Sequence, residues 1–249
     1  MRSLIKKRIA NFISNFYYNS EDASHVLTYH SVSADMQPEE FLPIYNIKPE
    51  IFTEQIKLIT DLNIKCGTIA ECYNNRSKLS ITFDDGYINT LENAAPILFD
   101  KKIPFTVFVT PKNIMNHKNI FMTVKDLKEL LKIPGAKIGS HGFSHVKLSD
   151  CSDNEIRNEL INSKKWIEDN MGCEVDAFSF PHGAYNQNTL NVLEKTNYKF
   201  ALSTKFGGIN SNMNNFCLPR IDIWSNDKIY EFKNKILGKW DWYSYFSKY

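Results

Sequence analysis

The chain has 249 residues, of which 43% are hydrophobic and 13% aromatic, so it is long enough to bury a large core as one globular domain. Its net charge is only +2, and no basic stripe with interleaved aromatic residues is present, which argues against a dedicated nucleic-acid-binding protein. The five cysteines are odd in number and form no C-x-x-C pair, so neither a zinc ribbon nor a disulfide framework is expected.

The first predicted element is an amphipathic helical extension over residues 1–24. Apolar residues recur there at helical spacing, with basic residues between them. Such a helix would pack on the following domain or lie on a membrane surface. No apolar run approaches the roughly 18 residues of a membrane span, and no signal-peptide core is evident. With unpaired cysteines, this predicts a cytoplasmic protein, with peripheral contact at the inner membrane surface as an option.

Residues 25–225 alternate between short apolar strands and helices, which predicts an α/β domain with a parallel sheet and right-handed crossovers. The predicted strands are 25–32, 64–68, 79–83, 104–109, 136–139, 177–180, 200–203 and 218–223. Helices are expected at 49–62, at 91–98, at 122–131, at 152–171 and at 186–196. Residues 226–249 form an aromatic tail that would pack on the domain or meet an interface.

Two adjacent carboxylates end the predicted strand 79–83, in the stretch Thr82-Phe83-Asp84-Asp85-Gly86. Neighbouring residues of a strand point to opposite faces, so this pair fits best where the strand gives way to a loop. One aspartate can then bind a metal while the other handles a proton. An ordinary Asp-Asp-Gly turn is the alternative interpretation.

Two histidines four residues apart follow the predicted strand 136–139, in the stretch Ser140-His141-Gly142-Phe143-Ser144-His145. In a helical turn or tight loop this spacing places both imidazoles on one side. With one carboxylate they would complete a three-ligand catalytic metal site that leaves positions open for water. Such a donor set suits zinc, and cobalt, nickel or iron would also fit.

Together with Phe178-Ser179-Phe180-Pro181-His182-Gly183, these stretches resemble the three ordered motifs of the polysaccharide deacetylases, the NodB-homology members of carbohydrate esterase family 4. The resemblance covers about residues 25–225. It implies a distorted, incomplete (β/α) barrel and a metal-dependent de-N-acetylase of N-acetylated sugars in glycan biosynthesis. The segment Tyr29-His30-Ser31-Val32 resembles the first strand of the branch that acts on poly-N-acetylglucosamine-type polymers.

The resemblance also implies roles for individual residues. Asp84 would be the general base that takes a proton from the attacking water. The backbone N–H of His182 would stabilise the oxyanion. The implied metal ligands are Asp85, His141 and His145, and the implied substrate-binding residues are Pro181, His182 and Tyr185.

The chain departs from the family pattern around the base. Ser179 stands where one branch of the family has an arginine that orients the base, and His182 stands where tyrosine is usual. Arg220 and Asp222 lie two apart on a predicted strand, so both can face the barrel interior and support Asp84. A purely structural ion pair between them is the alternative.

The family's late histidine, which supplies the general acid, has no counterpart after His182. His30 and His182 both end predicted strands, where a barrel site forms, and imidazole titrates near neutral pH. We therefore expect one of them, His30 first, to protonate the leaving amine. Alternatively, Asp84 returns the proton that it took.

Two other functions compete with de-N-acetylation of a glycan. One is removal of a formyl or acetyl group from a lipid-linked amino sugar. The other is an inactive barrel that binds glycans or scaffolds a complex. Loss of the late histidine favours the inactive barrel, and retention of both complete motifs disfavours it.

Overall fold

A computed structural model describes residue 13 and residues 23–35, 42–116 and 119–246 of the chain. The predicted helix in residues 1–24 lies almost wholly outside these described residues. Within them, no helix has both the length and the apolar character to cross a membrane.

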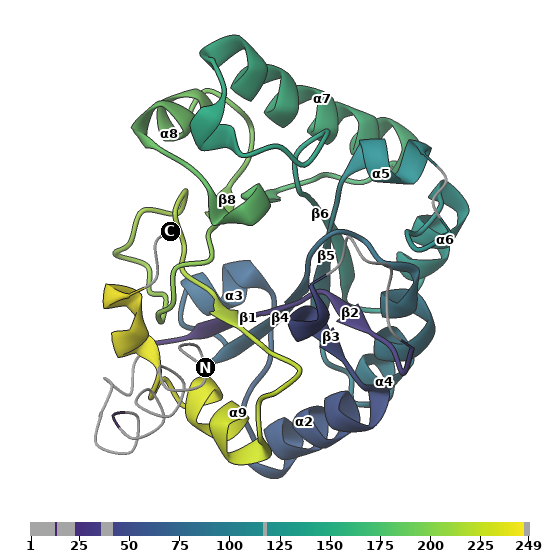
Figure 1. The fold of residues 1–249 in the computed structure, drawn as a ribbon, viewed down its shortest axis with the longest axis vertical. Helices are drawn as coiled ribbons and strands as arrows, with labels where there is room; N and C mark the ends of the chain where they lie inside the picture. The colour runs from purple at the N-terminus through teal and green to yellow at the C-terminus, as the bar shows by residue number, and fades with distance from the viewer. Residues whose placement is uncertain (1–12, 14–22, 36–41, 117–118, 247–249) are drawn as a thin grey trace.

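Seven parallel strands form one curled sheet in the order β8-β7-β6-β5-β4-β1-β9, with the helices around its outside (Figure 1). The strands are β1 (His25–Tyr29), β4 (Leu79–Phe83), β5 (Phe105–Val109), β6 (Ala136–Ser140), β7 (Ala177–Ser179), β8 (Phe200–Leu202) and β9 (Ile221–Asp222). A separate two-stranded sheet pairs β2 (Ser31–Val32) with β3 (Asn46–Ile47).

The helices are α2 (Pro49–Asp61), α3 (Ile69–Tyr73), α4 (Ala95–Asp100), α5 (Pro111–Met115), α6 (Val124–Leu130), α7 (Asp153–Met171), α8 (Gln187–Leu193) and α9 (Ile229–Ile236). A π-helical turn, η2 (Thr90–Ala94), leads into α4. The long helix α7 begins where Glu155 accepts hydrogen bonds from the N–H and hydroxyl of Ser152, and it ends at Gly172 with φ 67°. These are the start and stop signals that the sequence carries.

The sheet does not close into a regular barrel. The outer strands β8 and β9 are joined through an irregular segment, in which Leu218 makes an isolated bridge to Leu202 and the Arg220 N–H bonds the Lys205 carbonyl at 2.9 Å. This arrangement confirms the predicted α/β fold, a distorted and incomplete barrel.

The two faces of the central strands differ in character. Tyr29 and Phe83 stack at 5.5 Å and pack against Phe52 of α2, so this face forms the hydrophobic core. Thr28 and Thr82 precede these two residues and are paired with each other across β1 and β4. Their side chains point to the opposite face, toward the barrel interior. The polar interior is what positions the site.

One of the predicted strands is wrong. Residues 64–68 form no strand, and only Cys66 makes a bridge, to Leu79. The reason is that both edges of β4 are occupied beyond this point, by β1 and by β5. In the predicted aromatic tail, the described residues 226–246 include α9 and the 3₁₀ turn η5 (Asp241–Tyr245), and Trp240 is fully buried, as expected if the tail packs on the domain.

Candidate active site

A pocket of about 550 Å³ lies at the carboxyl ends of the strands, where active sites of β/α barrels form. Seven predicted site residues line it: His30, Asp84, Asp85, His141, His145, His182 and Asp222. They come from loops after β1, β4, β6 and β7 and from β9, so the fold gathers segments that are far apart in the sequence.

Asp85, His141 and His145 form a cluster with metal-ligand geometry. Oδ1 of Asp85 lies 3.3 Å from Nε2 of His145 and 3.6 Å from Nε2 of His141, and all three ligand atoms fall within 4.8 Å of one another. His141 donates from Nδ1 to the Ser179 carbonyl at 2.8 Å, which leaves Nε2 unprotonated toward Asp85. Two imidazoles and a carboxylate on an open pocket fit a catalytic divalent cation.

Strained backbone places three of these side chains. Asp85, His145 and His182 have φ of 71°, 61° and 58°, a left-handed conformation that non-glycine residues rarely adopt. Each such residue costs about 1–3 kcal/mol, and strain of this kind concentrates at functional sites. Each of the turns after β4, β6 and β7 therefore uses one residue in the left-handed conformation to direct a side chain into the pocket.

The histidine loop is held in place by Glu159 of α7. This buried carboxylate accepts hydrogen bonds from the N–H groups of Phe143 and Ser144 at 2.8 and 2.9 Å, and also from the Ser144 hydroxyl. Gly142 is required here, because its φ is 75° and an added Cβ would meet Glu159 Oε2 at 3.0 Å. Sequence reasoning missed Glu159, since its only signal is a charge on the inward face of a long helix.

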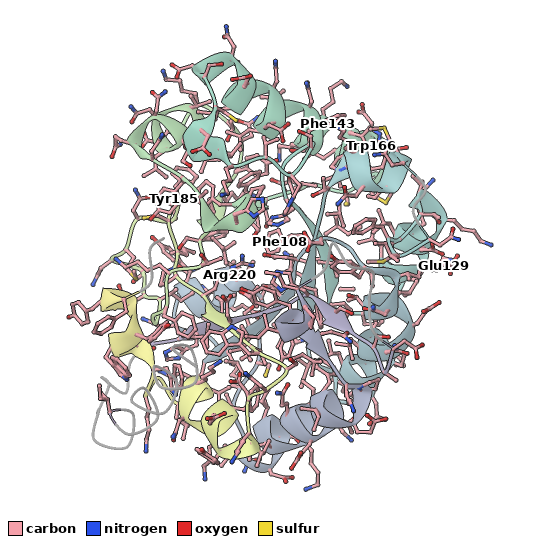
Figure 2. All side chains as sticks on the ribbon, viewed as in Figure 1. Phe108, Glu129, Phe143, Trp166, Tyr185 and Arg220 are labelled. Carbon is pink, nitrogen blue, oxygen red and sulfur yellow. The ribbon has the colours of Figure 1, made fainter. Side chains whose placement is uncertain are left out.

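Arg220 makes a two-pronged ion pair with Asp84. Its Nη1 and Nη2 donate to the two carboxylate oxygens at 2.8 and 2.7 Å, and its Nε bonds the Ser203 carbonyl at 3.0 Å. Ser179 donates its hydroxyl to Asp84 at 3.1 Å and accepts from Arg220 at 2.8 Å. Arg220 thus reaches the carboxylate directly, from the position where β9 begins, and points into the interior of the ring of strands (Figure 2).

The two adjacent aspartates have opposite pKa shifts. Burial alone would raise the pKa of Asp84, but the charges of Arg220 and His141 outweigh it and hold that pKa well below its usual range. Burial and the neighbouring Asp84 charge raise the pKa of Asp85 to about 6. Asp84 is therefore ionised at neutral pH by its ion pair, whereas Asp85 lacks such a partner and is the carboxylate that a cation would stabilise.

All four pocket histidines have lowered pKa values. Burial is the largest cause at each, and it lowers the pKa of His141 to about 3. His141 and His145 are thus neutral at pH 7, the form that binds a metal.

The two candidate acids differ in their surroundings. The His30 ring stacks on Tyr45 at 4.4 Å, and its Nδ1 is buried with no hydrogen-bond partner in the described part of the chain. The His182 ring lies 4.6 Å from that of His145 and is less buried. Of these two imidazoles, His30 therefore has the ring nitrogen that is available for a hydrogen bond with a substrate.

Three predicted site residues lie differently from the prediction. Pro181 and Tyr185 are not among the pocket-lining residues. Tyr185 stacks on Phe180 at 4.8 Å and lies toward the outside of the barrel (Figure 2), so contact of its side chain with substrate is disfavoured. Asp222 makes no hydrogen bond to Arg220 within the described residues, because the guanidinium is committed to Asp84, Ser179 and Ser203. The sequence predicts that Arg220 and Asp222 together support Asp84, whereas the residues that hydrogen-bond the Asp84 carboxylate are Arg220 and Ser179.

Aromatic residues complete the pocket wall and were not predicted. Tyr87 stacks on Phe121 at 5.1 Å, and the Tyr87 hydroxyl hydrogen-bonds Asp85, which lowers the pKa of that carboxyl. Tyr87 follows the first motif directly, so its nearness to the site was detectable. Tyr45 and Phe121 come from loops that no motif marks.

Known proteins resemble this chain in sequence. Over 252 residues the chain is 27% identical to a poly-β-1,6-N-acetyl-D-glucosamine N-deacetylase of Staphylococcus aureus (strain MSSA476), covering 94% of this chain and 80% of that protein. It is 31% identical over 143 residues to YxkH of Bacillus subtilis (strain 168), covering 57% of this chain but only half of YxkH.

Two solved structures share the fold. The Streptococcus pyogenes deacetylase PplD, in complex with acetate, superposes with a TM-score of 0.78 at 24% identity, covering 86% of this chain and 98% of PplD. IcaB from Ammonifex degensii superposes with a TM-score of 0.74 at 19% identity, covering 88% of this chain and 99% of IcaB.

The family model for polysaccharide deacetylases matches residues 73–201, just over half of the chain, and includes all three motifs. The match confirms the predicted family and, with it, the predicted class of enzyme, a carbohydrate deacetylase. On its sequence motifs, its fold and this match, the chain belongs to the polysaccharide deacetylase family.

Proposed function

We propose that this protein removes acetyl groups from N-acetylglucosamine units of a polysaccharide, with a divalent cation held by Asp85, His141 and His145. The observation that carries the proposal is the pairing of this donor cluster with Asp84, which Arg220 keeps ionised at the same pocket. The substrate class rests on the Staphylococcus aureus relative, whose name gives poly-β-1,6-N-acetyl-D-glucosamine and whose alignment covers 94% of this chain.

The residues divide the reaction as follows. A cation held by the three ligands would supply Lewis acidity and would lower the pKa of a bound water, to about 7 for zinc, the metal we propose. Asp84 accepts the proton of the attacking water. The low pKa of Asp84 makes it a weak base, so the proton transfer requires a water more acidic than bulk water. The His182 N–H, which has no acceptor among the described residues, donates to the developing oxyanion.

The leaving amine must gain a proton, because an amide anion is too poor a leaving group. We propose His30 as the donor, since it lines the pocket with an unpartnered Nδ1. Its lowered pKa makes the imidazolium a strong acid but a minor species at pH 7. If His30→Ala keeps the wild-type rate and the alkaline limb of the pH–rate profile, His30 is not the proton donor. The donor would then be His182, or Asp84 returning the proton that it took.

Acetate release with a panel of substrates tests the function. The panel contains β-1,6-linked N-acetylglucosamine oligomers, chitooligosaccharides, N-acylated nucleotide sugars and lipid-linked sugars, each assayed with zinc and with a chelator. Zinc-dependent acetate from the oligomers is expected. Formate or acetate from lipid-linked sugars alone would indicate the lipid-linked reaction. Neither product, with no stoichiometric metal in the purified protein, would indicate an inactive scaffold.

A cytoplasmic location and contact of residues 1–18 with a membrane surface remain predictions. Removal of these residues should leave metal binding intact. Equal partition of the full-length and shortened proteins in a liposome flotation assay would rule out the membrane contact.

A further inference from the structure

We propose that Asp222 is a substrate-binding residue whose carboxylate accepts a hydrogen bond from a ring hydroxyl of the N-acetylated sugar. This inference rests on the proposed function and deepens it. It replaces the role that the sequence suggested for Asp222, which was to support Asp84 together with Arg220.

Asp222 lies across the pocket from the proposed catalytic carboxylates. It pairs with Thr28 of β1 in strand β9, whereas Asp84 follows β4 on the other side of β1. Two strand spacings separate their backbones, about 10 Å. At this separation, Asp222 is within reach of the ring of a sugar whose acetamide lies at Asp84.

The Asp222 carboxylate lacks a donor within the described chain. The residue is only 7% exposed, lines the pocket, and has an Oδ1 that is buried with no hydrogen-bond partner. Lys235 donates to the Asp222 backbone carbonyl at 2.7 Å and thereby holds the strand in place. A buried carboxylate without a donor is costly, so a donor from the ligand is the expected complement.

The surroundings of Asp222 favour a sugar over a charged ligand. Tyr45 lines the same pocket, and the charge of Asp222 is the largest cause of its raised pKa. Tyr45 in turn stacks on His30, which gives the wall a flat aromatic surface beside a hydrogen-bond acceptor.

The charges that line the pocket limit the class of ligand that can bind there. Asp84, Asp85 and Asp222 line it, and no lysine or arginine does so among the described residues. Away from the cation site, a phosphate or pyrophosphate on the Asp222 wall would meet that carboxylate and no lysine or arginine of the described pocket lining. An uncharged glycan fits, and its hydroxyl groups are the donors that it has to offer.

The test uses substrates that lack single hydroxyl groups. A β-1,6-linked N-acetylglucosamine oligomer is compared with its 3- and 4-deoxy analogues, using zinc-loaded wild type and Asp222→Asn. In the wild type, one analogue should lose about 10- to 100-fold in kcat/KM, the usual effect of a hydrogen bond to a charged group. Asp222→Asn should make the ratio of the two rates clearly smaller, because its amide oxygen accepts only a weaker, neutral hydrogen bond.

Arg220→Lys is the matched control. It acts through Asp84, so it should lower the rates on both substrates and keep the wild-type ratio. The ratio does not depend on the fraction of folded enzyme, which separates binding from a structural defect.

Retention of the wild-type ratio in Asp222→Asn would overturn the inference. If that variant does not fold, the wild-type series still decides: equal rates on the parent and every analogue would overturn it. Failure of the wild type to release acetate from the parent oligomer would instead overturn the proposed function, and this inference with it.

Discussion

The two sides of the pocket are built in different ways. On the side of β4, β6 and β7, short motifs place the metal-ligand cluster through strained turns, such as those at Asp85 and His145. On the side of β1 and β9, the side chains depend on contacts between distant segments: Arg220 reaches Asp84 across 136 positions of the chain. The first side would bind the cation, and the second orients the base and, as we propose, the sugar.

The β9 side has its own support at the C-terminus. Lys235 of α9 is fully buried, and its Nζ lies 2.6 Å from Asp227, 2.7 Å from the Asp222 carbonyl and 3.8 Å from the Trp224 ring centre. Trp240 packs edge-on against Trp224 at 5.9 Å. A segment with no recognisable motif therefore packs behind one half of the site.

The largest expected effect is on the motif side. Asp85→Ala, His141→Ala and His145→Ala should each abolish stoichiometric metal binding and turnover, because three ligands are the minimum of a catalytic site. Metal analysis and acetate release measure this, and His182→Ala, beside the cluster but outside it, is the control that should keep its metal. Unchanged metal content in all three variants would refute the assignment.

The next largest effect is expected at Asp84, which joins the two sides of the pocket through its ion pair with Arg220. Asp84→Asn should bind metal normally and lose about 10²–10⁴-fold in turnover, the usual contribution of a general base. Metal content and kcat, measured on the same preparation, check this. A rate close to that of the wild type would remove Asp84 from the proton transfer.

A stability effect is expected on the β9 side. Lys235→Met should cost about 3–5 kcal/mol of unfolding free energy, because it leaves Asp227 with a buried charge and no ammonium partner. Lys233→Met, at an exposed position of the same helix, should stay within about 0.5 kcal/mol. Urea unfolding compares the two; equal stabilities would mean that the C-terminal cluster does not hold β9.

The smallest effect is a pH dependence at Asp222. Burial, with the charges of Asp84 and Asp227, raises its pKa to about 6, above the value of about 4 in an unfolded chain. Because the folded state binds this proton more tightly than the unfolded chain, Asp222 makes its full contribution to the unfolding free energy below about pH 4. That contribution is lost as the pH rises through about 6. Asp222→Asn should therefore remove about 2–3 kcal/mol of pH-dependent stability across this window.

Unfolding free energies of wild type and Asp222→Asn across the window give the difference directly. Asp85, whose pKa is raised in the same direction, is common to both proteins and cancels. Parallel profiles would show that the Asp222 carboxylate is better solvated than its burial indicates.

Much of this protein was predictable from sequence because its signals are local. Alternating strands and helices indicated the parallel α/β sheet, and the motif residues named the cluster of Asp85, His141 and His145. Each motif spans only a few residues after a strand, so strand polarity alone brings them to one edge of the sheet.

Only the tertiary structure decided how the second side of the pocket is made. The sequence suggested that Arg220 and Asp222 act together, yet the structure commits Arg220 to Asp84 and leaves Asp222 facing the pocket. Glu159, Tyr45 and Lys235 carried no recognisable pattern at all. Their roles depend on register and packing between segments distant in the chain, and such contacts form only when the sheet has curled and its helices have docked.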